Sequence, residues 1–195
     1  NKKKKWITNK NSRKVGNFLR TKYDCILTTS KTINSDNALL NCRIKGLEHK
    51  SPAVIILDRS FKIKKNLKVF RDKFREIFIF THTNNKDKEK YFKKIGVNII
   101  KLNRYENLKN DVSIVYLLLK QMGFNRILIE SGIKYINEVL RHNLIKNFYL
   151  FKSAVKLNNK GINNATPYSI RKLKTTIKNK VKINLNGENL YKIHL

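Results

Sequence analysis

The sequence predicts an α/β fold in which helices flank a mostly parallel sheet and the C-terminal portion is antiparallel. Short apolar runs of strand length alternate with stretches whose apolar residues recur at helical spacing, which is the pattern of a parallel α/β sheet. The run at 126–129 is continuously apolar after its first residue, as expected of a parallel strand buried on both faces. Three late runs, 147–151, 181–185 and 190–194, are expected to be strands that close the sheet.

The other strands are expected at the remaining strongly apolar runs, with turns where polar and hydroxylated residues follow them. In chain order, these strands are predicted at residues 25–28, 54–57, 77–81 and 97–102. Turns are predicted at residues 29–32 and 34–37, a loop or a poor helix at 60–74, and a solvated connection at 84–90.

Three helices are predicted in the first two thirds of the chain from apolar periodicity and capping residues. The first has Thr8 as a candidate N-cap and ends at Arg20. A short helix is expected around residues 91–92, and a strongly apolar helix at 112–122 ends at Gly123 as its C-cap. The inward-facing residues of the first helix are predicted to be Val15, Phe18 and Leu19.

The stretch at 125–144 combines a buried strand, a Ser-Gly turn and a helix. The backbone N–H groups and the dipole at the helix start favour an anion, and Gly132 lets the backbone approach a phosphate closely. Glu130 is expected at the carboxyl end of the strand, where open α/β sheets bind ligands. On these residues alone, an ordinary strand-to-helix turn is the simpler interpretation. The apolar face of the helix is predicted to consist of Ile133, Ile136, Val139, Leu140 and Leu144.

The composition bounds the domain count and the partners. At 195 residues the chain can bury a real core, and residues 1–195 are expected to form a single domain. The formal charge of +31 first indicates a nucleic-acid partner. Because Lys, Asn and Ile are all over-used and the basic residues are scattered, drift in base composition is favoured instead, and nucleic-acid binding is not expected. Such a surface would still attract phosphorylated small molecules.

Membrane, metal and disulfide classes are not supported. No apolar run reaches membrane-spanning length and no signal-peptide core follows the Lys-rich start, so we expect a soluble cytoplasmic protein without a membrane partner. Cys25 and Cys42 form no CxxC pair and have no clustered His, so neither a metal site nor a disulfide framework is expected. Asn1 is not an initiator methionine, which is compatible with a fragment of a longer protein.

Several blocks of the sequence stand in the order and spacing of a known family. They are WIT at 6–8, FLR at 18–20, DCILTTSKTINSDNALLNCR at 24–43, PAVIILDRS at 52–60 and ILIESG at 127–132. Through these blocks the chain resembles, over nearly its whole length, the reductase domain of the bifunctional deaminase-reductase of riboflavin biosynthesis. The resemblance implies a dihydrofolate-reductase-like fold and a homodimer.

The resemblance also implies a reaction. In that family, NADPH reduces the ribose of 5-amino-6-(5-phosphoribosylamino)uracil to a ribityl chain. Hydride passes to C1′ of the opened sugar, so the protein mainly holds two anionic partners in near-attack geometry and excludes water. No catalytic residue is assigned; Glu130 and a bound water are the candidates for the proton relay.

Ligand contacts follow from the resemblance position by position. The positions that match substrate contacts are Arg20, Leu40, Arg43 and Glu130. Those that match NADPH contacts are Trp6, Thr32 and Asp36, together with Ser131, Gly132, Ile133, Lys134 and Tyr135, where the family holds the cofactor's phosphates. Two positions usually held by Ser differ here: Lys4 takes the place of a substrate contact, and Arg59 is a candidate partner for the extra phosphate of NADPH.

Each role has a structural alternative. Arg20 and Arg43 can give bidentate hydrogen bonds to a ribose phosphate, worth about 1.5–3 kcal/mol each, or be two surface arginines among many. Glu130 can accept from ribose hydroxyls or simply be stabilised by the helix dipole. The corresponding alternative for Trp6 is a core aromatic, and that for Thr32 and Asp36 is a role as turn residues.

The chain departs from the family in ways that leave rival functions open. The family's domain begins with a central strand ending in Asp-Gly, which no residue before Trp6 supplies; truncation is the economical explanation. The HxE and PCxxC signature of the deaminase half is absent. The rivals are a related reductase of another pyrimidine or pterin, a nucleic-acid-binding protein that reuses the fold, and a catalytically silent subunit.

Overall fold

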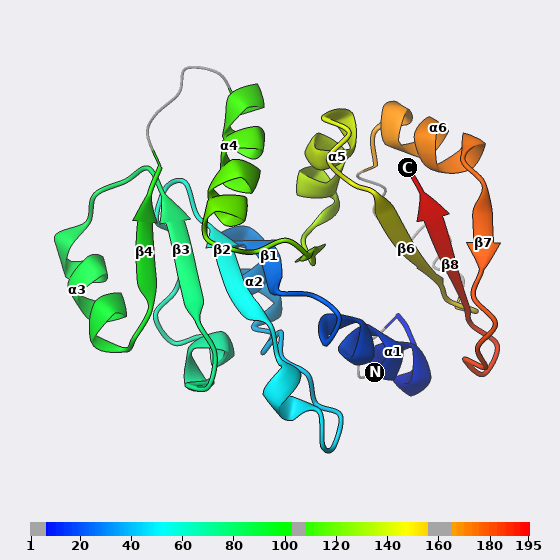
Figure 1. Ribbon diagram of the computed structural model, residues 1–195, viewed down its shortest axis with the longest axis horizontal. Coiled ribbons are helices and arrows are strands. Elements are labelled where there is room, and N and C mark those ends of the chain that lie inside the picture. The colour runs from blue at the N-terminus through cyan, green and yellow to red at the C-terminus, as the bar shows by residue number, and fades with distance from the viewer. Residues whose placement is uncertain (1–6, 103–107, 156–164) are drawn as a thin grey trace, which may run out of the picture. The chain divides into compact units, whose positions relative to one another are not determined.

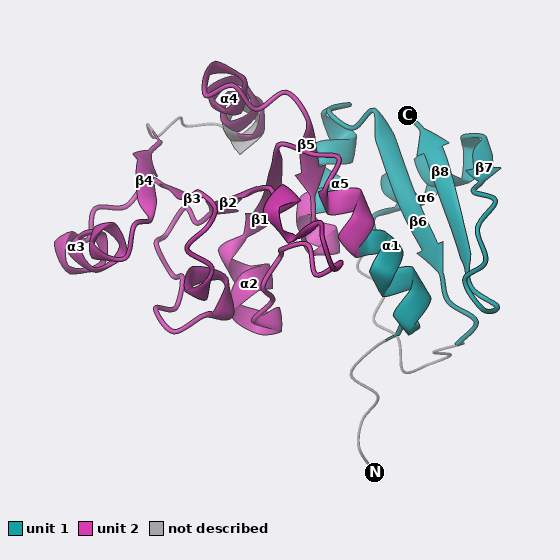
Figure 2. Cartoon of the chain, turned by 60° about the horizontal axis from the view of Figure 1, so that its bottom comes forward, with its two compact units in different colours: residues 1–16, 136–195 teal, residues 17–135 magenta. Residues whose placement is uncertain are grey.

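The structure is a computed structural model that describes residues 7–102, 108–155 and 165–195. In the second of these ranges, side chains are described from residue 112 onward. The chain divides into two compact units. Unit 2 comprises residues 17–135, and unit 1 comprises residues 1–16 and 136–195 (Figure 2). Whether the whole chain behaves as a single domain stays a prediction.

Unit 2 is built on a five-stranded parallel sheet in the order β4-β3-β2-β1-β5. Figure 1 labels β1 to β4, and Figure 2 labels β5 as well. Each strand lies close to a predicted apolar run, because consecutive Ile, Val, Leu and Phe residues can be buried only where both faces of a sheet are covered. The strands are β1 (Cys25–Thr29), β2 (Ala53–Leu57), β3 (Ile77–Thr81), β4 (Asn98–Lys101) and β5 (Ile127–Ile129). The predicted positions of these strands are confirmed, but the burial on both faces expected for the strand at 126–129 was wrong, because β5 lies at the sheet edge and is only partly buried.

Alternating residues of the strands feed two apolar layers. One layer gathers Ile26, Val54 and Ile79 from the sheet with Ile33 and Phe92 from two helices. The opposite face carries residues such as Cys25, which is fully buried; burial, together with the nearby charge of Asp24, raises the pKa of its thiol to about 12. The helix α4 contributes its own buried residues to the core, namely Val112, Val115 and Leu119.

Two helices of unit 2 begin at side-chain caps, in segments that the sequence predicted to be turns or connections. The predicted turn at 29–32 opens α2 (Ser30–Asp36), because the Thr29 hydroxyl accepts a bond from the Thr32 N–H. The predicted connection at 84–90 is mostly helix α3 (Lys86–Lys94), capped by Asn85. Both predictions were wrong, as was that of a turn at 34–37, which lies mostly within α2. A short polar helix is decided by its cap and by one or two buried residues rather than by a long apolar stripe. The other helical elements here are α4 (Leu108–Gln121), η1 (Glu48–Lys50) and η2 (Lys68–Arg71).

The strand β5 forms one edge of the parallel sheet. Among residues 7–102, 108–155 and 165–195, it pairs with β1 alone, and its three residues are only partly buried. Asp24 fastens the start of this edge, since its carboxylate accepts from the Asn125 and Arg126 N–H groups and from the Arg126 guanidinium. Although desolvation opposes the effect, these bonds keep the pKa of Asp24 below its usual value.

Unit 1 holds a three-stranded antiparallel sheet in the order β6-β8-β7. Its strands are β6 (Asn147–Lys152), β7 (Lys178–Lys180) and β8 (Asn189–His194), and the helix α6 (Pro167–Thr175) accompanies them. The strands predicted at 147–151 and 190–194 are confirmed, but the strand predicted at 181–185 was wrong, because β7 lies just before that run. The run at 181–185 instead enters the turn that is closed by the Leu185–Glu188 bridge. The C-terminal portion is therefore antiparallel, as predicted, but forms its own sheet.

The helix α1 (Lys10–Arg20) is capped by Asn9 rather than by Thr8. The Asn9 side chain accepts from the Ser12 N–H at 3.0 Å. Within unit 1, the buried Glu188 carboxylate accepts from the Asn9 N–H and from the Ser12 hydroxyl, which explains why a serine lies on the buried side of this helix. Phe18 was predicted to face inward, but it is 43% exposed.

Two surveys of the described residues give negative results. No helix among them is both long and apolar enough to span a membrane. No cluster of three or more His, Cys, Asp or Glu side chains suited to a metal ion occurs within residues 7–102, 108–155 and 165–195. Both Cys25 and Cys42 are buried free thiols.

Candidate functional site

Three hydroxyl groups meet at the carboxyl ends of β1 and β5 in unit 2. The Oγ1 atoms of Thr29 and Thr32 lie 3.0 Å apart, and the Ser131 Oγ lies 3.2 and 3.3 Å from them. The Gly132 N–H donates to the Thr32 Oγ1 at 3.0 Å. These four residues, named here the hydroxyl cluster, join the start of α2 to the turn that leads into α5 (Ile133–Arg141).

The hydroxyl cluster brings two helix N-termini together. Backbone N–H groups and helix dipoles at both starts favour negative charge, so the arrangement suits a phosphorylated ligand. One expectation needs correction, since the Gly132 N–H is not free but bonded to Thr32. An added Cβ at Gly132 would meet Thr32 Oγ1 at 3.6 Å, an ordinary contact, so the protein itself does not require glycine there.

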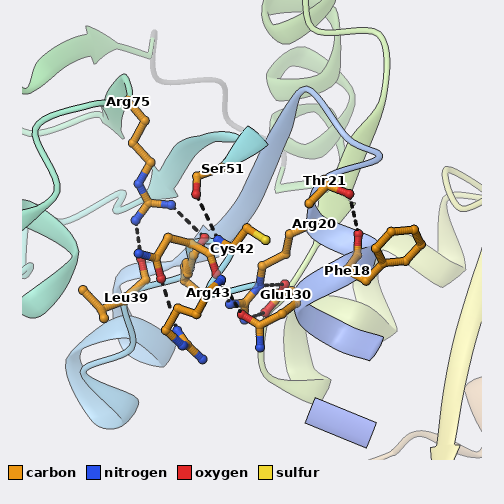
Figure 3. Close-up of polar contacts among 12 residues, drawn as sticks. Phe18, Arg20, Thr21, Leu39, Cys42, Arg43, Ser51, Arg75 and Glu130 are labelled. Atoms are coloured by element: carbon orange, nitrogen blue, oxygen red, sulfur yellow. Dashed lines mark hydrogen bonds and ion pairs between the residues drawn. The ribbon is translucent and has the colours of Figure 1, made fainter. Parts of the chain in front are cut away.

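Glu130, the residue before the cluster, is held by Arg20. The Arg20 Nε donates to Glu130 Oε1 at 2.7 Å and its Nη2 donates to Oε2 at 2.8 Å (Figure 3). The Arg20 Nη1 donates to the Asn41 carbonyl at 2.8 Å. The side chains of Arg20 and Glu130 are 12% and 29% exposed, so the pair is partly screened from water. The sequence predicted a bidentate bond from Arg20 to a substrate phosphate, whereas here its bidentate partner is Glu130.

Arg43 lies on the same side of unit 2 as this ion pair. It is exposed, its Nη1 donates to the Asn41 Oδ1 at 3.2 Å, and its N–H donates to Asn17. Partial burial and the nearby Arg20 charge lower the pKa of Arg43, while the Glu130 charge opposes them. An exposed cation beside a like charge has an electrostatic reason to attract an anion.

Leu40, a predicted substrate contact, is buried and has a left-handed backbone with φ 55°. That conformation is unfavourable for a branched residue, so the surrounding contacts must hold it. The substrate-contact positions Arg20, Leu40, Arg43 and Glu130 are therefore brought together around one segment, residues 39–43.

At the end of β2, Asp58 and Arg59 approach the cluster. The buried Asp58 carboxylate accepts from the Ser30 hydroxyl at 2.8 Å and from the Ile63 N–H at 2.6 Å, which ties the next loop to the start of α2. Burial raises the pKa of the Tyr135 hydroxyl, and the Arg59 charge partly counters this. The Arg59 charge therefore acts on the Tyr135 hydroxyl of α5.

The other predicted cofactor residues are less closely grouped. Ile133, partly buried, and Lys134, exposed, lie in the first turn of α5. Asp36 is exposed at the far end of α2, about 9 Å along the helix from its start. Lys4 and Trp6 lie outside the described residues. Their roles stay predictions.

Several residues of the site were not predicted from the sequence. Thr29 had a signal, because a hydroxyl that directly follows a strand is a common helix cap. Asn41 and Arg75 had none, because their bonds to Arg20 and to the carbonyls of Leu39 and Leu40 span 21 to 36 positions of sequence.

Comparisons with known proteins identify related sequences and structures. The family model described as the RibD C-terminal domain matches residues 1–157. A riboflavin biosynthesis protein RibD from Aquifex aeolicus is 29% identical over 187 residues, which cover 95% of this chain and 50% of that protein. A 5-amino-6-(5-phosphoribosylamino)uracil reductase from Buchnera aphidicola is 28% identical, covering 75% of this chain and 73% of its relative.

Solved structures share the fold. RibD from Acinetobacter baumannii aligns with a TM-score of 0.74 at 17% identity, over 98% of this chain and 52% of that one. The riboflavin biosynthesis reductase Rib7 of Saccharomyces cerevisiae aligns with a TM-score of 0.71 at 18% identity, over 96% and 81%. The predicted dihydrofolate-reductase-like α/β fold is thus confirmed. Because the family model matches most of the chain, this protein belongs to the RibD C-terminal domain family.

Proposed function

We propose that this chain reduces 5-amino-6-(5-phosphoribosylamino)uracil to its ribityl product with NADPH. The chain spans about half the length of the first curated relatives it matches, at 50% and 42%. The Buchnera relative whose name states this activity supports the proposal. The observation that carries it is the continuity of the site: Glu130, paired with Arg20 beside Arg43, directly precedes the hydroxyl cluster.

The two halves of the site suit two anionic ligands. The hydroxyl cluster and the two helix starts suit the pyrophosphate of a dinucleotide, while the exposed Arg43, near Arg20, suits a sugar phosphate. NADPH would supply the hydride. What the chain's own residues do is hold the two ligands in near-attack geometry.

The preference for NADPH over NADH is assigned to Arg59. A guanidinium binds a phosphate by two parallel N–H bonds, and the extra phosphate is the group that distinguishes the two cofactors. Arg59 follows the end of β2, and its charge acts on the Tyr135 hydroxyl of α5. Homodimerisation is likewise a proposal, and sedimentation equilibrium of the purified protein would test it.

The decisive experiment compares turnover of the phosphorylated substrate with turnover of its dephosphorylated form. The purified protein is incubated with NADPH and either the phosphorylated substrate or its dephosphorylated form, with cofactor oxidation followed by absorbance and the product by mass. The proposal expects a product heavier by two hydrogens, formed efficiently only from the phosphorylated compound. A reductase of another pyrimidine or pterin would not demand the phosphoribosyl group.

The first variant is Arg43→Ala, with Arg71→Ala, another exposed arginine of unit 2, as its control. Loss of a charge-assisted phosphate bond of about 1.5–3 kcal/mol should raise KM for the substrate by roughly tenfold or more. KM for NADPH should change little, because Arg43 lies with the substrate residues. An equal rise in both KM values would contradict the assigned role.

A further inference from the structure

Arg75 is a buried cation that the proposed chemistry does not use directly. Its side chain is only 3% exposed and pairs through Nε with the Asp72 carboxylate at 3.3 Å. Burial, and secondarily the repulsion from Arg20, lower its pKa to about 10. Enclosing a guanidinium costs desolvation energy, so a residue held this way needs compensating contacts.

Those contacts are made to the segment at 39–43. The Arg75 Nη1 donates to the Leu40 carbonyl at 2.7 Å, and Nη2 donates to the Leu39 carbonyl. Asp72 also accepts from the Asn41 Nδ2 at 3.4 Å. In Figure 3 the Arg75 guanidinium meets this segment near Leu39, and the paired side chains of Arg20 and Glu130 lie farther along it.

The segment in turn carries the substrate residues. Leu40 is held at φ 55°, where a non-glycine residue costs about 1 kcal/mol or more. Asn41 then bonds Arg20 through its carbonyl and Arg43 through its side chain. Arg75 thus bonds the strained turn, and the next residue of that turn, Asn41, bonds both arginines of the site.

We propose that Arg75, held by Asp72, is a positioning residue that sets the turn at 39–43 so that Arg20 and Arg43 are placed for a phosphorylated sugar. This rests on the proposed function. Arg75 does not reach the ligand itself, because its side chain is enclosed and both Nη groups already bond the turn. An arginine that only stabilised the fold would have no reason to affect one ligand more than the other.

Arg75→Met and Arg75→Lys test this in the full chain, with Arg71→Met as the matched control for loss of an arginine. Arg75→Met should raise KM for the phosphoribosyl substrate about tenfold or more, while KM for NADPH changes less than about twofold. Arg75→Lys keeps the charge and can reach one carbonyl, so it should recover part of the loss. Asp72→Asn, a milder change, should move the same ratio in the same direction if Arg75→Met does not fold.

A second readout is independent of turnover. Binding of ribose 5-phosphate, measured by calorimetry, should be about tenfold weaker in Arg75→Met than in the unaltered protein. If the unaltered protein binds ribose 5-phosphate but does not oxidise NADPH, the proposed function fails while the positioning role stands on the binding ratio. The positioning role would be overturned by equal changes in both KM values or by no recovery in Arg75→Lys. Equal affinity of Arg75→Met and the unaltered protein for ribose 5-phosphate would also overturn it.

Discussion

The role assigned to Glu130 changes once its hydrogen-bond partners are known. The sequence offered it as a proton relay or as a group that orients substrate. Both of its oxygens accept from Arg20, at 2.7 and 2.8 Å, which is the geometry of a fixed carboxylate rather than of an acid ready to give up a proton. We therefore favour the orienting role.

Glu130→Gln should raise KM for the substrate and lower stability together. The amide keeps the shape but leaves the Arg20 charge without its counter-charge, so we expect a loss of about 1–2 kcal/mol in the free energy of unfolding. Urea denaturation and steady-state kinetics measure the two effects. Glu138→Gln, in the exposed Arg141 pair of α5, is the control. A collapse of kcat with KM unchanged would instead favour the proton relay.

At the scale of elements, the functional claim depends on the junction between β5 and α5. Gly132 tests it because its backbone is not in the left-handed region and an added methyl group would make only an ordinary contact. Gly132→Ala should therefore fold normally, yet hinder a pyrophosphate that approaches the turn. We expect the Kd for NADPH, measured by fluorescence titration, to rise about tenfold without loss of melting temperature.

Gly16→Ala is the matched control, since Gly16 lies inside α1 with open space around it. Removing a helical glycine should stabilise the protein by about 0.5–1 kcal/mol and leave cofactor affinity unchanged. Equal cofactor affinity in Gly132→Ala and the unaltered protein would show that the turn does not hold the phosphates.

At the scale of the whole molecule, the charge of +31 remains to be explained by experiment. If the charge reflects drift in base composition, the Kd for duplex DNA should be higher than about 1 µM at physiological salt. It should be equal for two unrelated sequences, and binding should be lost as the salt concentration rises. Fluorescence anisotropy with both duplexes at several salt concentrations measures this. Tight binding to one sequence at physiological salt would favour the nucleic-acid rival.

The sequence by itself determined the strands of the parallel sheet and the family, whereas the substrate and cofactor positions stay predictions. Long apolar runs such as those of β2 and β3 can be satisfied only by burial on both faces, so local composition was sufficient there. It misjudged α2 and α3, because a single capping oxygen decides whether a short polar stretch becomes a turn or a helix.

Only the tertiary structure decided which groups act together. No local signal in the sequence predicts that Arg20 pairs with Glu130, 110 positions away. None predicts that Arg75 donates to the Leu40 carbonyl. The separate antiparallel sheet of unit 1 likewise depends on the register between β6 and β8. Periodicity records how much of a segment is buried, whereas the partner of a charged or hydrogen-bonding group is set by chain segments distant in sequence, and that information exists only in the folded chain.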